Sequence, residues 1–381
     1  MAGIYIHVPF CAKRCAYCDF YTQTNHNLIN EYVDAVCKEI ELRKDYLHNE
    51  PIKTIYFGGG TPSQLSPEQI EKIMAQLGRF YDLSACEEVT LEANPDDLTD
   101  EFLSRLLALV PINRISMGVQ SFNDDDLRFL NRRHSAQQAK EAVALCRKHG
   151  ITNISIDLIY GLPDQTIEKW ERNIQEAIAL GTPHLSAYHL IYEEGTPLYK
   201  LWEKGKVKQA DEELSVEMFK MLIDELEKAG IEQYEISNFA KDGAYSKHNT
   251  SYWQATPYLG LGPSAHSFDG TNREWNVASI KQYVESIQAN TVNREIEELD
   301  TRTRYNDYIL TGLRTKWGIE LNFIASNFGA DYLSYCLEQA EPFLKEGLLV
   351  RDNNTVKLSR EGIFISDGIM SDLMKLSYTE L

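Results

Sequence analysis

Three of the seven cysteines in this 381-residue chain lie within one short segment near its start. They are Cys11, Cys15 and Cys18, in the sequence HVPFCAKRCAYCDF that begins at His7. Such thiols indicate metal or redox chemistry, although burial as ordinary apolar side chains is an alternative. Structural zinc usually takes four protein ligands. The nearby candidate for a fourth ligand is His7, which lies in an expected strand. Three thiolates suit three irons of a 4Fe-4S cluster and leave the fourth iron open to a small molecule.

Composition and charge exclude several classes of protein. The chain is 43% hydrophobic and 25% charged, as ordinary globular proteins are. It has no apolar run of about 20 residues, and its first residues do not resemble a signal peptide. We therefore expect a cytoplasmic protein with reduced thiols and no membrane anchor in this chain. The net charge of −19 repels a phosphate backbone, so nucleic acid is not an expected partner.

Six β-rich runs alternate with amphipathic helical stretches in the first 240 residues. The expected strands are 3–8, 53–57, 87–92, 112–118, 153–159 and 184–191. Between them, apolar residues recur at helical spacing, as at Val33, Val36 and Ile40. Ser66 followed by Pro67 predicts the start of a helix. This βα alternation predicts an α/β fold with a parallel sheet, either open and doubly wound or a partial barrel.

The polar and glycine-rich segments favour the barrel. They fall just after the expected strands: the cysteines after the first, FGGGTP after the second, EANP after the third and GVQSF after the fourth, with DLIYGLP around the end of the fifth. In α/β barrels the loops at the carboxyl ends of the strands build the active site. We therefore predict a partial (β/α)6 barrel in residues 1–240, with one large pocket at its mouth.

The remaining residues are divided into a connecting segment, 241–290, and a smaller C-terminal domain, 291–381. The domain is predicted to contain helix, helix, hairpin and helix, with Leu348–Val350 and Thr355–Leu358 flanking a turn at residues 352–354. This order is typical of winged-helix domains, which often bind DNA. Residues 294–381 carry 10 Lys and Arg against 15 Asp and Glu, a net of −5. The charge favours a packing or lid role instead.

The cysteine segment, with Tyr17 before its third cysteine, resembles the radical S-adenosylmethionine (SAM) superfamily. The resemblance implies that Cys11, Cys15 and Cys18 hold a 4Fe-4S cluster, and that the amino and carboxylate groups of SAM bind its fourth iron. In that superfamily an electron from the cluster cleaves SAM to a 5′-deoxyadenosyl radical, so an electron donor is also implied. The protein then supplies binding and shielding. The isolated cysteines are expected to be structural: Cys37, Cys86, Cys146 and Cys336.

The FGGGTP segment is similar to the superfamily's GGE-type motif, with Thr in place of Glu. The chain is more similar still to the oxygen-independent coproporphyrinogen III dehydrogenase (HemN) group, continuously over the barrel and more weakly in the tail. That resemblance assigns SAM contacts to Tyr5, Gly59, Gly60, Thr61, Glu92, Gln120, Arg132 and Asp157. Arg132 can clamp a carboxylate, and the two acidic residues can accept hydrogen bonds from ribose or ammonium. The alternatives are a surface cation at Arg132 and a satisfied polar group at Asp157.

Two features depart from the dehydrogenase pattern. The fourth cysteine of that group is replaced by Phe20, and the chain lacks the extension that precedes the first strand. Downstream, His248-Asn249-x-x-Tyr252-Trp253 resembles the HNxxYW motif of the HemW haem chaperones. This resemblance implies haem as cargo and a haem-accepting protein as partner, commonly at the membrane.

A neutral histidine is a suitable axial ligand for haem iron, provided that its ring is exposed. Tyr252 and Trp253 offer flat apolar area with a polar edge. The alternatives are that these residues form a turn and fill a core, or that His266 is the ligand. We predict a radical-SAM-type haem chaperone. A coproporphyrinogen III dehydrogenase is the second hypothesis and a winged-helix nucleic-acid binder the third, and whether the chain is an enzyme stays open.

Overall fold

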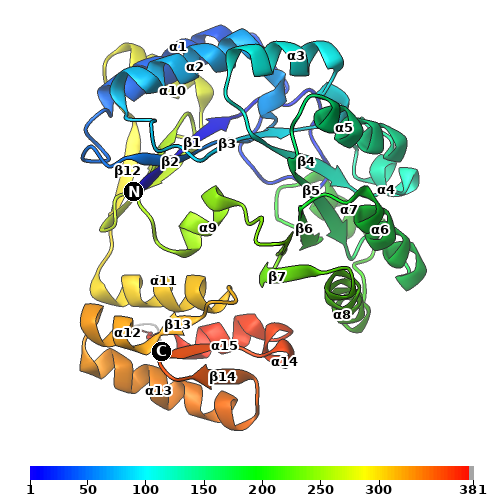
Figure 1. Cartoon of the computed structure of the whole chain (residues 1–381), viewed down its shortest axis with the longest axis vertical. Coiled ribbons are helices and arrows are strands. Elements are labelled where there is room, and N and C mark those ends of the chain that lie inside the picture. The colour runs from blue at the N-terminus through cyan, green and yellow to red at the C-terminus, as the bar shows by residue number, and fades with distance from the viewer. Residues whose placement is uncertain (377–381) are drawn as a thin grey trace.

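The computed structural model describes residues 1–376, and a curved sheet with helices on its outer face dominates it (Figure 1). Six parallel strands form the middle of the sheet: β1 (Ala2–Val8), β2 (Ile52–Gly59), β3 (Glu88–Ala93), β4 (Arg114–Gln120), β5 (Asn153–Tyr160) and β6 (His184–His189). The helices of this part are α1 (Ile29–Leu42), α2 (Pro67–Phe80), α3 (Asp100–Leu109), α4 (Asp124–Phe129), α5 (Ala136–Lys148), α6 (Ile167–Leu180), α7 (Pro197–Glu203) and α8 (Glu212–Lys228). The six predicted strands are confirmed, each end within two residues.

Local signals start the helices as expected. The Ser66 side chain accepts a hydrogen bond from the backbone N–H of Gln69, and the Gln69 side chain accepts one from the backbone N–H of Ser66. Pro67 occupies the first position of α2, where its missing N–H is no loss. This capping box fixes the point at which the chain turns from the β2 loop into α2.

The strands carry apolar and polar residues in alternation. In β4, Ile115, Met117 and Val119 are buried in the main hydrophobic core, whereas Arg114 and Ser116 face the concave side and line a cavity. Successive side chains of a strand point to opposite faces, so the outer face packs on the helices. Parallel strands buried on both faces are normally apolar throughout. The polar inner face therefore marks the concave side as a binding cavity.

Six further strands extend the sheet at both sides. They are β7 (Ile231–Glu235), β8 (Asn238–Lys241), β9 (Tyr258–Leu261), β10 (His266–Phe268), β11 (Asn272–Asn276) and β12 (Arg294–Glu298). The order is β12-β11-β10-β9-β1-β2-β3-β4-β5-β6-β8-β7, with β9 parallel to β1. Because β12 and β7 are edges, the barrel is partial, as predicted. Much of the segment expected to be a connection, 241–290, joins this sheet, and α10 (Ile280–Gln288) packs on α1.

A short helix, α9 (Lys247–Trp253), lies on the concave side of the sheet (Figure 1). The Glu88 carboxylate accepts hydrogen bonds from the backbone N–H groups of Lys247 (3.1 Å) and His248 (3.0 Å). Thr54 Oγ1 is hydrogen-bonded to His248 Nδ1 at 2.8 Å. Glu88 begins β3 and Thr54 lies near the start of β2, so α9 closes the cavity from the amino ends of the strands.

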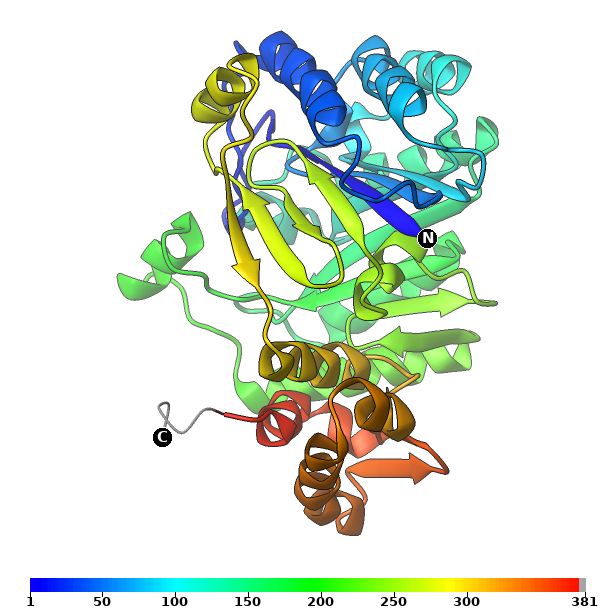
Figure 2. The same ribbon diagram turned by 90° about the vertical axis from the view of Figure 1, so that its left-hand side faces the viewer.

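The C-terminal part has its own hydrophobic core and lies below the barrel (Figures 1 and 2). Its elements are α11 (Thr301–Leu313), β13 (Ile319–Glu320), α12 (Leu321–Asn327), α13 (Ala330–Lys345), β14 (Leu349–Asp352), β15 (Thr355–Leu358), α14 (Arg360–Ile363) and α15 (Ser366–Leu373). The predicted hairpin is confirmed, and the domain is mainly helical and winged-helix-like. No helix within residues 1–376 is long and apolar enough to cross a bilayer.

Candidate functional site

The cysteine loop follows β1 and is held by backbone hydrogen bonds to distant segments. The N–H of Cys11 donates to the carbonyl of Gln23 (2.9 Å), and that of Ala16 donates to the carbonyl of Leu130 (3.1 Å). Tyr17 packs against a small apolar cluster that contains Leu130. The loop is therefore ordered by the surrounding chain, and its thiols stay available.

The glycine segment after β2 lies directly against this loop. The Gly60 N–H donates to the carbonyl of Val8 and the Thr61 N–H to that of Phe10, both at 2.8 Å. A Cβ on Gly60 would lie 2.7 Å from the Val8 carbonyl oxygen, so no side chain fits there. The Thr61 hydroxyl donates to Cys11 Sγ at 3.4 Å. The second loop thus supports the first thiol.

Ten predicted site residues line one pocket of about 480 Å³, here called the cluster pocket. They are Cys11, Cys15, Cys18, Gly59, Gly60, Thr61, Glu92, Gln120, Arg132 and Asp157. Tyr5 does not line this pocket but a second, inner cavity. The rim carries three exposed apolar side chains, Phe20 (61% exposed), Ile191 (62%) and Tyr188 (43%).

Arg132 lies beside a cysteine and is not a free surface cation. Its Nη1 donates to Cys15 Sγ at 3.2 Å, and its Nη2 donates to Asn94 Oδ1 at 2.6 Å and to the Gly118 carbonyl. The guanidinium thus lies against one of the three thiols of the cysteine loop. Asn94, which orients the guanidinium, was not identified from the sequence.

The two acidic residues of the pocket are buried and have raised pKa values. Burial raises the pKa of Glu92 to about 7 and that of Asp157 to about 6. Glu92 accepts hydrogen bonds from the Tyr56 hydroxyl (2.7 Å) and from the Gly59 N–H (3.2 Å). Near neutral pH, Glu92 can therefore offer either an acceptor or a donor to a ligand hydroxyl or amine.

Gln120 ends β4 in an unusual backbone conformation. Its backbone φ angle is +68°, a value that residues other than glycine rarely adopt. The pairing of β4 with β5 also shifts register just before Gln120. Such strain persists only where the surrounding structure enforces it, and it is concentrated at functional sites. The Gln120 side chain lines the cluster pocket.

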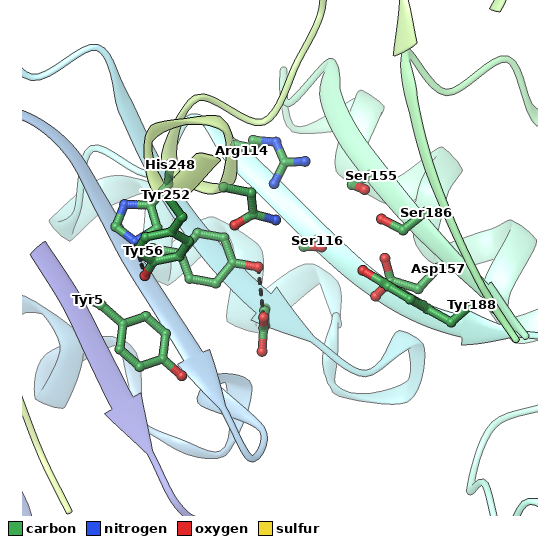
Figure 3. Close-up of a pocket in the computed structure, with 12 residues that line it drawn as sticks. Tyr5, Tyr56, Arg114, Ser116, Ser155, Asp157, Ser186, Tyr188, His248 and Tyr252 are labelled. Carbon is green, nitrogen blue, oxygen red and sulfur yellow. Dashed lines mark hydrogen bonds between the residues drawn. The ribbon is translucent and has the colours of Figure 1, made fainter. Parts of the chain in front are cut away.

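The inner cavity has a volume of about 270 Å³ and lies between the strands and α9 (Figure 3). Tyr5, His248 and Tyr252 line it. It adjoins the cluster pocket, because the two share four lining residues: Glu92, Ser116, Asp157 and Tyr188. The barrel interior therefore holds an outer site near the thiols and an inner site near α9.

The histidine of the HNxxYW motif is fully buried, with 0% of its surface exposed. Both of its ring nitrogens are hydrogen-bonded, Nδ1 to Thr54 and Nε2 to the Tyr252 hydroxyl at 2.8 Å. Burial lowers its pKa to about 3, so the ring is neutral. In this conformation His248 holds α9 in place and has no nitrogen free for a metal.

The other haem candidates lie elsewhere. Trp253 lines neither cavity, and the Arg314 guanidinium of the C-terminal part lies 5.2 Å from its ring centre. His266 is exposed on β10 and stacks on Trp275, with ring centres 5.9 Å apart. The structure thus brings His248 and Tyr252 together in the lining of the inner cavity, which neither Trp253 nor His266 lines.

The donor set fits an iron–sulfur cluster. Burial raises the pKa of Cys18 to about 11 and also raises that of Cys11, so iron binding must release protons from these thiols. Within residues 1–376 no three His, Cys, Asp or Glu side chains converge on one metal ion. A 4Fe-4S cluster has no such requirement, because each cysteine binds a different iron.

A partial α/β barrel with three cysteines in the loop after its first strand defines a radical SAM protein. Residues 5–177 match the Radical SAM superfamily and residues 299–365 match the HemN C-terminal domain. The solved structure of Escherichia coli coproporphyrinogen III oxidase (HemN) superposes with a TM-score of 0.84 at 23% identity, over 98% of this chain and 90% of that one.

Relatives of nearly the same length are closer in sequence. The chain is 35% identical to the heme chaperone HemW of Bacillus subtilis, over 97% of this chain and 98% of the relative. It is 32% identical to that of Lactococcus lactis, over 97% and 96%. The chain belongs to the HemW family.

Several cavity residues were not identified from the sequence, above all Arg114, Tyr56 and Ser116. A signal was present, because polar residues occur at every second position of the strands. Arg114-x-Ser116 in β4 is one case, and Asn153-x-Ser155-x-Asp157 in β5 is another. In a barrel strand this alternation predicts side chains that face a polar interior.

Proposed function

We propose that this protein is a haem chaperone of the radical SAM type, which binds a 4Fe-4S cluster, SAM and haem and transfers haem to an acceptor protein. The observation that carries the proposal is its full-length similarity to proteins named heme chaperone HemW. Phe20 supports it, because this side chain stands where the dehydrogenase pattern requires a cysteine and is exposed at the rim of the cluster pocket.

In this proposal Cys11, Cys15 and Cys18 hold three irons of the cluster. The cluster supplies an electron that can cleave SAM, from a donor protein or reductant. Arg132 and Asn94 bind the SAM carboxylate, since the guanidinium already lies beside Cys15. The other SAM contacts are made by the residues around it: Gly59, Gly60, Thr61, Glu92, Gln120 and Asp157, with Tyr5 from the inner side.

The haem site is proposed to include His248, Tyr252 and Trp253. Ligation by His248 requires that α9 moves, because the ring is buried and both nitrogens are hydrogen-bonded. His266 is the alternative ligand, since it is already exposed on β10. The apolar rim of Phe20, Ile191 and Tyr188 suits the flat face of a porphyrin.

Anaerobic reconstitution followed by haem titration tests the proposal. Wild type should bind haem saturably, and His248→Ala should change the haem spectrum and weaken binding, whereas His266→Ala should not. Identical spectra and affinities in wild type and His248→Ala would reject this ligand.

The acceptor is proposed to be a haem protein at the membrane. The proposed compartment is the cytoplasm, where all seven free cysteines stay reduced.

A coproporphyrinogen dehydrogenase is the second candidate, favoured by the likeness of fold to HemN. Conversion of coproporphyrinogen to protoporphyrinogen with SAM and a reductant would support it and overturn the chaperone. We expect no conversion, because the chain has Phe20 in place of the fourth cysteine.

A further inference from the structure

The inner cavity contains a buried cation with donors that no protein group satisfies. Arg114 begins β4 and is only 1% exposed, and its Nε and Nη1 atoms make no hydrogen bond. Buried guanidinium groups are normally paired and hydrogen-bonded, because leaving such donors unmade is costly. The Arg114 guanidinium therefore needs a hydrogen-bond acceptor that the described residues do not supply.

Glu88 is the nearest carboxylate, and it does not fill this role. Its oxygens lie 3.9 Å from Arg114 Nε at the closest, which is an ion pair without a hydrogen bond. Both Glu88 oxygens accept hydrogen bonds from α9 instead, from the N–H groups of Lys247 and His248. Glu88 balances the charge of Arg114 but leaves its guanidinium free to bind a ligand.

The surroundings of Arg114 are built from polar groups of adjacent strands. Ser116 follows it on the same face of β4, and Ser155 and Ser186 line the same cavity from β5 and β6 (Figure 3). Asn249, the second residue of the HNxxYW motif, lines it from α9. This arrangement gives the asparagine of the motif a role. His248 fixes α9, and α9 places Asn249 in the lining of the inner cavity.

We propose that this cavity binds a carboxylate through Arg114 and, building on the proposed haem function, that the carboxylate is a propionate of the porphyrin. A guanidinium presents paired N–H donors that match a carboxylate. The cavity of about 270 Å³ is too small for a whole porphyrin but has room for a propionate arm. The carboxyl groups of its lining, Glu92 and Asp157, also line the cluster pocket.

Haem and its dimethyl ester distinguish the propionate from other contacts. Wild-type reconstituted protein should bind haem about ten- to a hundredfold more tightly than the ester, the range for a hydrogen bond to a charged group. Arg114→Gln should lose this preference, with haem affinity reduced to that of the ester. Arg114→Lys keeps the charge opposite Glu88 and should retain part of it, which shows that any loss is not a folding defect.

Equal binding of haem and ester by wild type overturns the inference and leaves the haem function intact. Weaker SAM binding in Arg114→Gln with unchanged haem binding also overturns it, because the carboxylate would then be that of SAM. If wild type binds no haem, the proposed function is rejected, and sodium propionate alone then tests whether the cavity binds a carboxylate. Propionate should raise the melting temperature of wild type but not that of Arg114→Gln. No difference between the two would mean that the cavity holds only water.

Discussion

At the scale of single residues, the three loop cysteines are set apart from the other four by their surroundings. Cys11, Cys15 and Cys18 line one pocket, whereas Cys146 and Cys336 are buried in hydrophobic cores. A thiol can ligate iron only where a cluster has room to bind. The three cysteines predicted to bind the cluster therefore share a pocket that the other four do not line.

Replacement of any one loop cysteine by alanine should abolish the brown chromophore and most of the iron after anaerobic reconstitution. Two thiolates cannot hold three irons, so the effect should be nearly complete for each variant. Cys37→Ala, on α1, is the matched control and should keep full iron content. Full iron retention in all three loop variants would reject the cluster assignment.

Glu92→Gln should change the pH dependence of stability in the cluster-free protein. The pKa of Glu92 is raised from 4.5 to about 7, so between these values the folded state binds a proton that the unfolded state does not. The contribution of protonated Glu92 to the wild-type free energy of unfolding is then lost as pH rises through 7. The melting temperature of the variant, relative to wild type, should increase from pH 5.5 to pH 8. Glu71→Gln, at an exposed position on α2, should show no such trend.

Residue types and spacing predicted the pocket better than the haem site. The cysteines follow β1, the glycines lie where β2 ends, and the acidic residues lie within β3 and β5. Because parallel strands end at one edge of the sheet, the proximity of these residues is a consequence of the fold. The burial of His248 depends on Thr54 and Glu88, which are distant in sequence, and nothing local to the motif reveals it.

At the scale of elements, the close approach of the β2 loop to the cysteine loop should be sensitive to a single methyl group. Gly60→Ala would place a Cβ 2.7 Å from the Val8 carbonyl, within backbone that cannot yield easily. We expect a loss of about 1–3 kcal/mol in unfolding free energy and weaker SAM binding. Urea denaturation and SAM titration measure these effects.

Gly78→Ala is the control for this prediction. Gly78 lies within α2, and an added Cβ would meet only Leu83 at 3.9 Å. It should stabilise the protein by about 0.5–1 kcal/mol, since alanine is the better helix former. Unchanged stability and SAM affinity in Gly60→Ala would show that the two loops do not depend on each other.

The βα alternation made the central strands and their helices predictable, because periodicity and capping are local signals. The outer strands were not predicted. β9 to β11 are each five residues or fewer, and the sequence between Tyr258 and Asn276 is rich in turn residues. Their pairing with β1 and with each other is a tertiary effect.

At the scale of the whole molecule, a partly buried ion pair joins the barrel to the C-terminal part. Arg314 donates through Nε (3.1 Å) and Nη2 (2.6 Å) to Glu235, which is buried at the end of β7. The Ile236 N–H also donates to the Arg314 carbonyl. The two parts are thus linked by backbone and by charge.

Arg314→Ala should destabilise the protein by about 3 kcal/mol, because it leaves the Glu235 carboxylate buried without its cation. Arg360 is the matched control: it also bridges the two parts, by exposed pairs with Asp224 and Glu227. Arg360→Ala should cost less than about 1 kcal/mol. Equal effects of the two substitutions in urea denaturation would contradict a buried linkage.

Transfer of haem is the most direct test of the central claim. The reconstituted protein is loaded with haem and mixed anaerobically with haem-depleted respiratory membranes, with free haem at the same concentration as the comparison. A chaperone should lose its haem spectrum while the membrane haem proteins regain theirs, faster than with free haem. Haem that stays on the loaded protein, or membranes that recover no faster than with free haem, would contradict the account.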